Sequence, residues 1–154
     1  MNFLKLDKKK ILEYQKNRDP YLMIDCATKV IPGKFAKGYK KLTKKDWFFD
    51  VHWPGDPNMP GMLQIESLIQ MSALAVQTLP GNKGKTLYLV GANNLKFFRK
   101  VLPGDKLEIE SKLLKESRGI YNFESSGFVN GKKTCKADFS LIISGSIKFK
   151  IKKY

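Results

Sequence analysis

The longest apolar segment of the chain runs from Pro60 to about Leu79, and its pattern predicts a buried helix. Pro60 suits the first helical turn, where its missing N–H is not needed, and Pro80-Gly81 ends the element. Between these ends, apolar residues cover almost every face of the helix instead of a single stripe. A helix that is apolar all round is normally buried. We therefore expect a helix over about 60–79 that other elements enclose.

The segments on either side of this helix alternate apolar and polar residues or carry short apolar runs, as β-strands do. Hairpin-length turns separate most of them, and Asn130-Gly131 is the strongest of these signals because both residue types tolerate the positive φ of a two-residue turn. About six strands are expected, over residues 21–31, 34–42, 85–98, 105–116, 119–129 and 133–145. The fold class is therefore α+β, with an antiparallel sheet of about six strands wrapped around one long central helix.

Three further segments carry patterns of their own. Residues 1–15 mix apolar and charged positions and lack the uninterrupted apolar run of a signal peptide, so we expect a short amphipathic helix over about 7–16. The tail over 145–154 alternates apolar residues with lysines, which predicts a lysine-blunted edge strand. Residues 46–61 are rich in Pro and Gly and are expected to form a long ordered loop, a kind of segment that often carries function.

Length and composition indicate a single domain over residues 1–154, large enough to bury a core, with no apolar run long enough for a membrane span. With no secretion signal, Cys26 and Cys135 are expected to be free thiols in a reducing cytoplasm. The chain has 29 Lys and Arg against 14 Asp and Glu, a net charge of +15. Such a charge attracts nucleic acid, an acidic membrane surface or an acidic carrier protein. The lysines are spread along the chain, so charge alone leaves the partner open.

His52 and Glu66 are the residues whose placement indicates chemistry. His52 is the only histidine of the chain, and the Pro-Gly turn that follows it restricts the backbone. Glu66 lies about 9 Å into the expected helix among apolar neighbours, where desolvation raises the pKa of a carboxyl and keeps it protonated near neutral pH. A structural histidine and a glutamate that reaches solvent or a lysine are the alternatives that the sequence leaves open.

Two more residues belong with this pair. Gly61 lies at the expected helix start, where unpaired N–H groups and the positive end of the helix dipole could bind an oxyanion. Gln70, four residues beyond Glu66 on the same face, could bind the carboxyl or an ordered water. Together these groups suit removal of a proton beside a carbonyl while a β-hydroxyl leaves as water. One histidine and two separated cysteines make no usual zinc site, so no metal and no cofactor are expected.

The stretch from His52 to Gln70, HWPGDPNMPGMLQIESLIQ, resembles the motif of the β-hydroxyacyl-acyl carrier protein dehydratases, H-F-P-G-x-P-x-M-P-G-x-L-x-x-E-(A/S)-x-x-Q. Glutamate instead of aspartate at position 66 favours the FabZ type over the FabA type. NRDPYLMID and YLVGANNLKFFRKVLPGD extend the resemblance over nearly the whole chain. Two differences concern the histidine: Val51 stands where the family usually has glycine, and Trp53 replaces the usual phenylalanine.

The resemblance implies a hotdog fold and a homodimer, alone or within a trimer of dimers, whose active sites cross the subunit interface. It also implies conversion of 3-hydroxyacyl-acyl carrier protein to trans-2-enoyl-acyl carrier protein in fatty acid biosynthesis or a related pathway. His52 of one subunit would then take the α-proton, and Glu66 of the partner subunit would protonate the departing hydroxyl or hold the water. The Gly61 N–H would polarise the thioester carbonyl.

The resemblance implies supporting roles as well. Tyr88 matches the family tyrosine at the mouth of the acyl tunnel, and Val51 and Gln70 would support the site. The phosphopantetheine arm of an acidic acyl carrier protein would dock on a basic rim, for which Arg99 and Lys100 are candidates. Two alternatives stay open. One is a hotdog acyl thioesterase, which would not need this His/Glu pair. The other is a non-catalytic carrier-binding or nucleic-acid-binding protein, although the lack of a concentrated basic block counts against nucleic acid.

Overall fold

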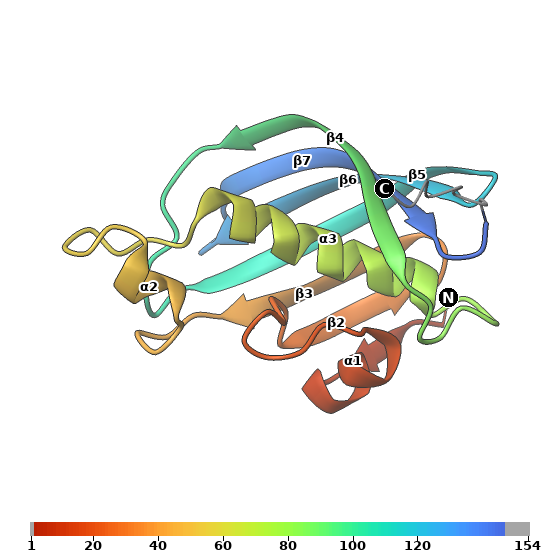
Figure 1. Cartoon of the computed structure of the whole chain (residues 1–154), viewed down its shortest axis with the longest axis horizontal. Coiled ribbons are helices and arrows are strands. Elements are labelled where there is room, and N and C mark those ends of the chain that lie inside the picture. Colours follow the sequence, from red (N-terminus) through yellow and green to blue (C-terminus); the bar gives the residue numbers. More distant parts are fainter. Residues whose placement is uncertain (1, 147–154) are drawn as a thin grey trace, which may run out of the picture.

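Seven strands form one antiparallel sheet in the computed structural model, which describes residues 2–146 (Figure 1). The strands are β1 (Leu4–Leu6), β2 (Cys26–Ile31), β3 (Phe35–Lys41), β4 (Leu87–Phe97), β5 (Lys106–Ser117), β6 (Ile120–Val129) and β7 (Lys132–Ile143). Their order across the sheet is β1-β2-β3-β5-β6-β7-β4. The helices of the described part are α1 (Lys8–Tyr14), α2 (Phe48–Val51) and α3 (Gly61–Gln77). The sheet curls around α3, which confirms the predicted α+β class.

Helix α3 lies on the concave side of the sheet (Figure 1) and is buried along most of its length. Its buried residues join those of the strands in one core cluster. Full burial of one Leu or Phe side chain contributes about 1.5–3 kcal/mol, so this packing is the main stabilising feature of the fold. Fully or nearly fully buried members of the cluster include Leu68, Met71, Leu74, Leu107, Ile109 and Phe123.

Gly38 allows α3 to approach the sheet closely. A Cβ at this position would lie 2.0 Å from the carbonyl oxygen of Cys26 and 2.6 Å from the Cε of Met71. Any larger residue would therefore push β3 away from both its neighbouring strand and the helix. The same close approach sets the depth at which the side chains of α3 lie in the sheet.

Two-residue turns connect the last three strands. Arg118 and Gly119 join β5 to β6 with φ values of 52° and 79°, and Asn130 and Gly131 join β6 to β7 with φ values of 50° and 74°. Positive φ at both turn positions is the geometry that suits the twist of a hairpin. Strand β4 is different, because it pairs with β7 although the chain continues from it to β5. It forms an edge of the sheet of described residues.

The observed elements differ from the predicted ones in three places. The sheet has seven strands instead of about six, because β1 is too short to show in the sequence pattern. The strand expected over 21–31 begins only at Cys26. The expected loop over 46–61 contains the helical turn α2, which the Pro- and Gly-rich composition hid. The edge strand predicted within 145–154 falls mostly outside the described residues.

The helix ends also differ from the expected bounds. Helix α1 begins at Lys8 because Asp7 is its N-cap and accepts a hydrogen bond from the Lys10 N–H at 2.8 Å. Helix α3 runs over Gly61–Gln77, three residues shorter than the expected 60–79. In the described part of the chain, no helix combines the length and the apolar character needed to cross a membrane.

Candidate active site

His52 is held at the C-terminal end of α2. Its backbone N–H donates to the Phe48 carbonyl at 2.8 Å, and its Nδ1 lies 2.9 Å from the carbonyl oxygen of Asn58. A carbonyl oxygen can only accept a hydrogen bond, so a neutral imidazole here carries its proton on Nδ1. The unprotonated Nε2 is then the ring nitrogen available to take a proton.

The residues on either side of His52 show how the ring is oriented. Trp53 adopts a φ of 61°, a left-handed conformation that is uncommon for a bulky side chain, and its ring stacks on the imidazole with 4.6 Å between centroids. Val51 ends the helical turn α2 and does not need positive φ. The valine in place of the family's usual glycine is therefore compatible with the backbone that presents His52, and its side chain is 68% exposed.

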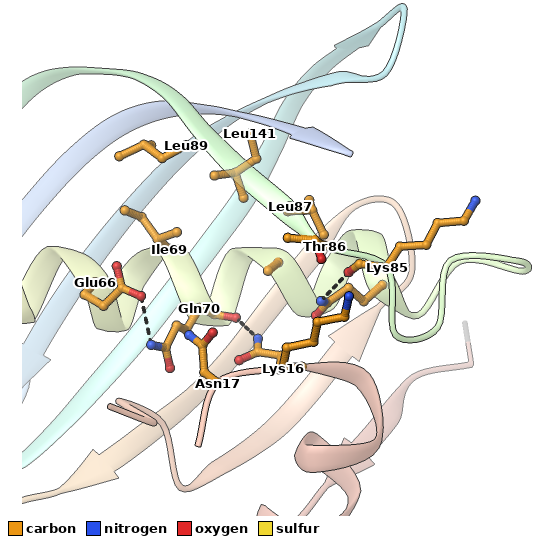
Figure 2. A pocket seen from close by; sticks show the side chains of 13 residues that line it. Lys16, Asn17, Glu66, Ile69, Gln70, Lys85, Thr86, Leu87, Leu89 and Leu141 are labelled. Carbon is orange, nitrogen blue, oxygen red and sulfur yellow. Dashed lines mark hydrogen bonds between the residues drawn. The ribbon is translucent and has the colours of Figure 1, made fainter. Parts of the chain in front are cut away.

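Glu66 lies on the second turn of α3 and is held by Gln70, one turn later on the same face. The Nε2 of Gln70 donates to the Glu66 carboxyl and to the Tyr21 carbonyl, each at 2.9 Å, and its Oε1 accepts from the Met23 N–H at 2.8 Å. The backbone of residues 21–23 thus fixes the amide, and the amide fixes the carboxyl. Figure 2 shows the hydrogen bond between Gln70 and Glu66.

The surroundings of Glu66 favour its protonated form. Burial raises the pKa of the carboxyl above its ordinary value of 4.5, and the hydrogen bond from Gln70 opposes this shift only in part. No lysine or arginine among the described residues forms an ion pair with Glu66 that would lower the pKa again. Glu66 can therefore donate a proton at a pH where an exposed carboxyl could not.

A pocket of about 160 Å³ extends from Glu66 along α3. One wall is apolar, because Leu89 on β4 pairs directly with Leu141 on β7 and both lie near Ile69 (Figure 2). The other wall is rich in side-chain amides. The lining residues are Gln15, Lys16, Asn17, Glu66, Ile69, Gln70, Ala73, Gln77, Lys85, Thr86, Leu87, Leu89 and Leu141. A mixed apolar and polar lining of this kind suits an acyl chain attached to a polar reacting group.

Gly61 is the first residue of α3, and no side chain in the described residues caps this helix end. Its half-buried position lies against the Phe97 ring, since a Cβ at Gly61 would lie 2.8 Å from the Cε1 of Phe97. The helix N-terminus therefore offers backbone N–H groups and the positive end of the helix dipole to an anionic oxygen.

Comparison with known proteins places the chain in a family. Residues 16–138 match the FabA-like domain family. The chain belongs to this family. The predicted resemblance is therefore confirmed over most of the sequence.

Two members of known name illustrate the likeness. The chain is 46% identical over 114 residues to the 3-hydroxyacyl-[acyl-carrier-protein] dehydratase FabZ of Clostridium novyi, covering 73% of this chain and 80% of that protein. It is 39% identical over 140 residues to the FabZ of Enterococcus faecalis, covering 91% of this chain and 99% of the relative. Members of the FabZ type thus match the chain along nearly its full length.

The fold is also found among solved structures. The dehydratase heterocomplex ApeI:P from Xenorhabdus doucetiae contains a chain that superposes with a TM-score of 0.74, at 14% identity, over 86% of this chain and 90% of that one. At this identity the likeness concerns the fold alone. It supports the predicted hotdog architecture of this FabA-like chain.

The structure brings together some of the predicted site residues and separates others. Glu66 and Gln70 share one pocket, but His52 and Gly61 do not line it. Tyr88 lies on β4 between the pocket residues Leu87 and Leu89, and strand alternation directs its side chain to the other face, where it is exposed. One chain by itself therefore does not join the imidazole and the carboxyl in a common cavity.

The two basic candidates for carrier docking follow β4 at the surface. Lys100 already forms an ion pair with Asp56, at 2.6 Å, which links it to the loop that follows His52. Arg99 is exposed and makes no ion pair with a described residue.

Sequence reasoning missed several parts of the site. The Asn58 carbonyl that orients His52 and the backbone groups of Tyr21 and Met23 that hold Gln70 carry no side-chain signal. Gln77 could have been found, because it lies eleven residues after Glu66 and so on the same stripe of the helix. Gln15 could not, because only the packing of the segment after α1 on α3 brings it to the pocket.

Proposed function

We propose that this chain removes water from a 3-hydroxyacyl thioester of acyl carrier protein and forms the trans-2-enoyl thioester, as a step of fatty acid biosynthesis. The main observation is Glu66, a carboxyl whose pKa is raised by burial in a pocket with one apolar wall. The names of the FabZ relatives and the retained His-to-Glu motif support the same reaction. Free thiols at Cys26 and Cys135 fit a cytoplasmic setting.

His52 acts as the base in this proposal. Its Nε2 removes a proton from C2 of the substrate, beside the thioester carbonyl, and the positive charge that forms on the ring is stabilised by the Asn58 carbonyl at Nδ1. The electron pair left at C2 delocalises into the carbonyl. The N–H of Gly61, at the positive end of α3, binds the resulting oxyanion.

Glu66 acts as the acid. Its proton moves to the hydroxyl on C3, the C3–O bond breaks and water leaves, while the electron pair at C2 forms the double bond. His52 ends protonated and Glu66 ends ionised, so a proton passed from the imidazole to the carboxylate restores both groups. Gln70 keeps the carboxyl in place throughout and donates a hydrogen bond to its ionised form.

We further propose that the site is completed by a second copy of the chain in a homodimer, alone or in a trimer of dimers. The support comes from β4, an eleven-residue strand at the edge of the described sheet that exposes Tyr88, Leu89, Val90 and Phe97. A long apolar edge strand is a ready surface for pairing with another strand. In this proposal, pairing there carries the partner's His52 toward Glu66.

The acyl carrier protein is the proposed macromolecular partner. A net charge of +15 favours association with an acidic protein. Arg99 is the better candidate of the two predicted docking residues, because Lys100 is already paired with Asp56.

A dehydration assay with 3-hydroxybutyryl-acyl carrier protein tests the proposal. The conjugated enoyl thioester should appear as ultraviolet absorbance, and His52→Ala and Glu66→Gln should each lower the rate by at least about 100-fold. Release of free carrier thiol without enoyl product would instead identify a thioesterase. Tight, salt-dependent binding of oligonucleotides with no turnover would identify a nucleic-acid-binding protein.

A further inference from the structure

The loop between His52 and α3 is attached at two neighbouring points to the segment that follows β4. The Nζ of Lys100 donates to both carboxylate oxygens of Asp56, at 2.9 and 2.6 Å. The N–H of Met59 donates to the carbonyl of Val101 at 2.7 Å. Met59 and Val101 are almost completely buried, whereas both members of the ion pair are about half exposed. The loop is therefore held at positions 56 and 59.

Asn58 lies between these two attachment points and contacts the imidazole directly. Its carbonyl oxygen is 2.9 Å from the Nδ1 of His52. Its side-chain amide donates to the Asp56 carbonyl at 2.9 Å, so Asn58 is bound to the same residue that Lys100 holds. Asn58 is itself buried. A displacement of Asp56 would therefore also move the carbonyl that orients the ring.

Asp56 is connected to the imidazole on the other side of the loop as well. Its N–H donates to the Trp53 carbonyl at 2.9 Å and closes a turn over residues 53–56. The ring of Trp53 stacks on the ring of His52. Pro54 and Pro57 have no N–H with which to bind neighbouring segments, so the shape of this loop depends on a small number of such contacts.

We propose that the Lys100–Asp56 ion pair positions His52, so that Lys100 acts on the base of the enzyme and not on the carrier protein. The inference rests on the proposed function, in which Nε2 of His52 takes the proton from C2. Without the ion pair, the turn over residues 53–56 can shift, and the Asn58 carbonyl and the Trp53 ring shift with it. Small displacements of a catalytic group lower the rate strongly, because proton transfer requires a close and aligned approach.

A small uncharged substrate, the 3-hydroxybutyryl thioester of N-acetylcysteamine, separates positioning from carrier docking. Lys100→Met and Asp56→Ala should each lower kcat with this substrate by about three- to tenfold and leave KM within about twofold, since neither side chain binds the substrate. The double variant should be no slower than the slower single variant, because the two residues act as one unit. Lys100→Arg keeps the charge and the donors and should retain kcat within about twofold.

Lys37 and Glu110 provide a matched control. They form an ion pair of 2.7 Å between β3 and β5, outside the His52 loop, and both side chains are partly exposed like those of Lys100 and Asp56. Lys37→Met removes the same charge and the same kind of contact. It should leave kcat within about twofold of the unmodified value, since exposed ion pairs contribute little to stability.

The imidazole spectrum tests the inference without turnover. His52 is the only histidine, so ¹⁵N labelling of histidine reports on a single ring. At alkaline pH the unmodified protein should show one neutral tautomer, with its proton on Nδ1, because the Asn58 carbonyl accepts from that nitrogen. Lys100→Met and Asp56→Ala should show both tautomers, whereas Lys37→Met should keep the spectrum of the unmodified protein.

The possible results are distinguishable. Unchanged kcat with the uncharged thioester, or an unchanged imidazole spectrum, in Lys100→Met and Asp56→Ala overturns the positioning role. A raised KM for the carrier-bound substrate alone in Lys100→Met, or an equal loss of kcat in Lys37→Met, also overturns it. Asp56→Ala repeats the test if Lys100→Met does not fold. Failure of the unmodified protein to dehydrate either substrate overturns the proposed function, and the spectrum then decides the positioning of the ring by itself.

Discussion

The side-chain amide of Gln70 lies 2.9 Å from the carboxyl of Glu66 and is itself fixed by the backbone at Tyr21 and Met23. A single glutamine therefore sets both the orientation of the acid and the extent to which its pKa rises. The hydrogen bond favours the ionised carboxyl, whereas burial favours the protonated one, and burial is the larger of the two effects. The pH at which the acid becomes ionised is thus a property that mutation of a neighbour can change.

Gln70→Met should move the alkaline limb of the pH profile of kcat/KM to higher pH. Loss of the hydrogen bond from Gln70 removes the one opposing cause and raises the pKa of Glu66 further, so the acid stays protonated over a wider range. The variant should also lose about 2 kcal/mol of stability, because the groups at Tyr21 and Met23 lose their partner. An alkaline limb that stays in place or moves to lower pH in the folded variant would contradict this assignment.

Glu66→Gln should unfold at a higher denaturant concentration than the unmodified protein at neutral pH. The folded pKa of Glu66 lies above its unfolded value, so its stabilising contribution is present below the unfolded pKa and is lost as pH rises through the folded one. The glutamine introduced by Glu66→Gln can still accept the hydrogen bond from Gln70. Because it has no charge, its variant does not lose this stability as the pH rises. The difference in midpoint between the two proteins should close below about pH 4, where the carboxyl is protonated in both states.

Glu13 offers a control in which the pKa shift has the opposite direction. Its pKa is lowered, chiefly by hydrogen bonds to Lys83 and Lys10. Glu13→Gln should lose stability at neutral pH, and the loss should vanish in acid. If the denaturation midpoints of Glu66→Gln and Glu13→Gln shifted in the same direction, desolvation of Glu66 would not be the cause of the change in stability in Glu66→Gln.

Mixing His52→Ala with Glu66→Gln should restore activity if each site takes its base and its acid from different subunits. Mixed dimers then hold one intact site, and random exchange of subunits predicts about a quarter of the unmodified rate. Each variant alone is the control and should stay inactive after the same unfolding and refolding. Mixed dimers that form, as shown by mass spectrometry, yet remain inactive would place both groups of a site in one chain.

Gly61→Ala should lower activity by about 10- to 100-fold with little loss of stability. The added Cβ would lie 2.8 Å from the Cε1 of Phe97, so this exposed ring must shift beside the helix start where the oxyanion is proposed to bind. Gly61→Ala combined with Phe97→Leu removes the crowding and should recover most of the rate. If Phe97→Leu did not restore activity to Gly61→Ala, crowding against the Phe97 ring would not be the cause of the lost activity.

Much of the fold could be read from the sequence because local patterns specify it. The apolar residues of 61–77 require a buried helix, and Asn130-Gly131 permits few structures other than a tight hairpin. Strand β1 was not predicted because three residues are too few to show an alternating pattern. Helix α2 was not predicted because its single turn lies in a segment rich in proline and glycine. Helix ends shifted by a few residues, since capping contacts such as that of Asp7 decide them.

The sequence by itself also determined that Glu66 lies among the apolar residues of the helix, where burial of a carboxyl raises its pKa. Only the tertiary structure decided what surrounds it. Three contacts depend on how the chain packs: the Asn58 carbonyl with His52, the backbone at Met23 with Gln70, and the side chain of Gln15 with the Gln70 carbonyl. Backbone groups are the same in every residue, so their position, not their identity, carries this information.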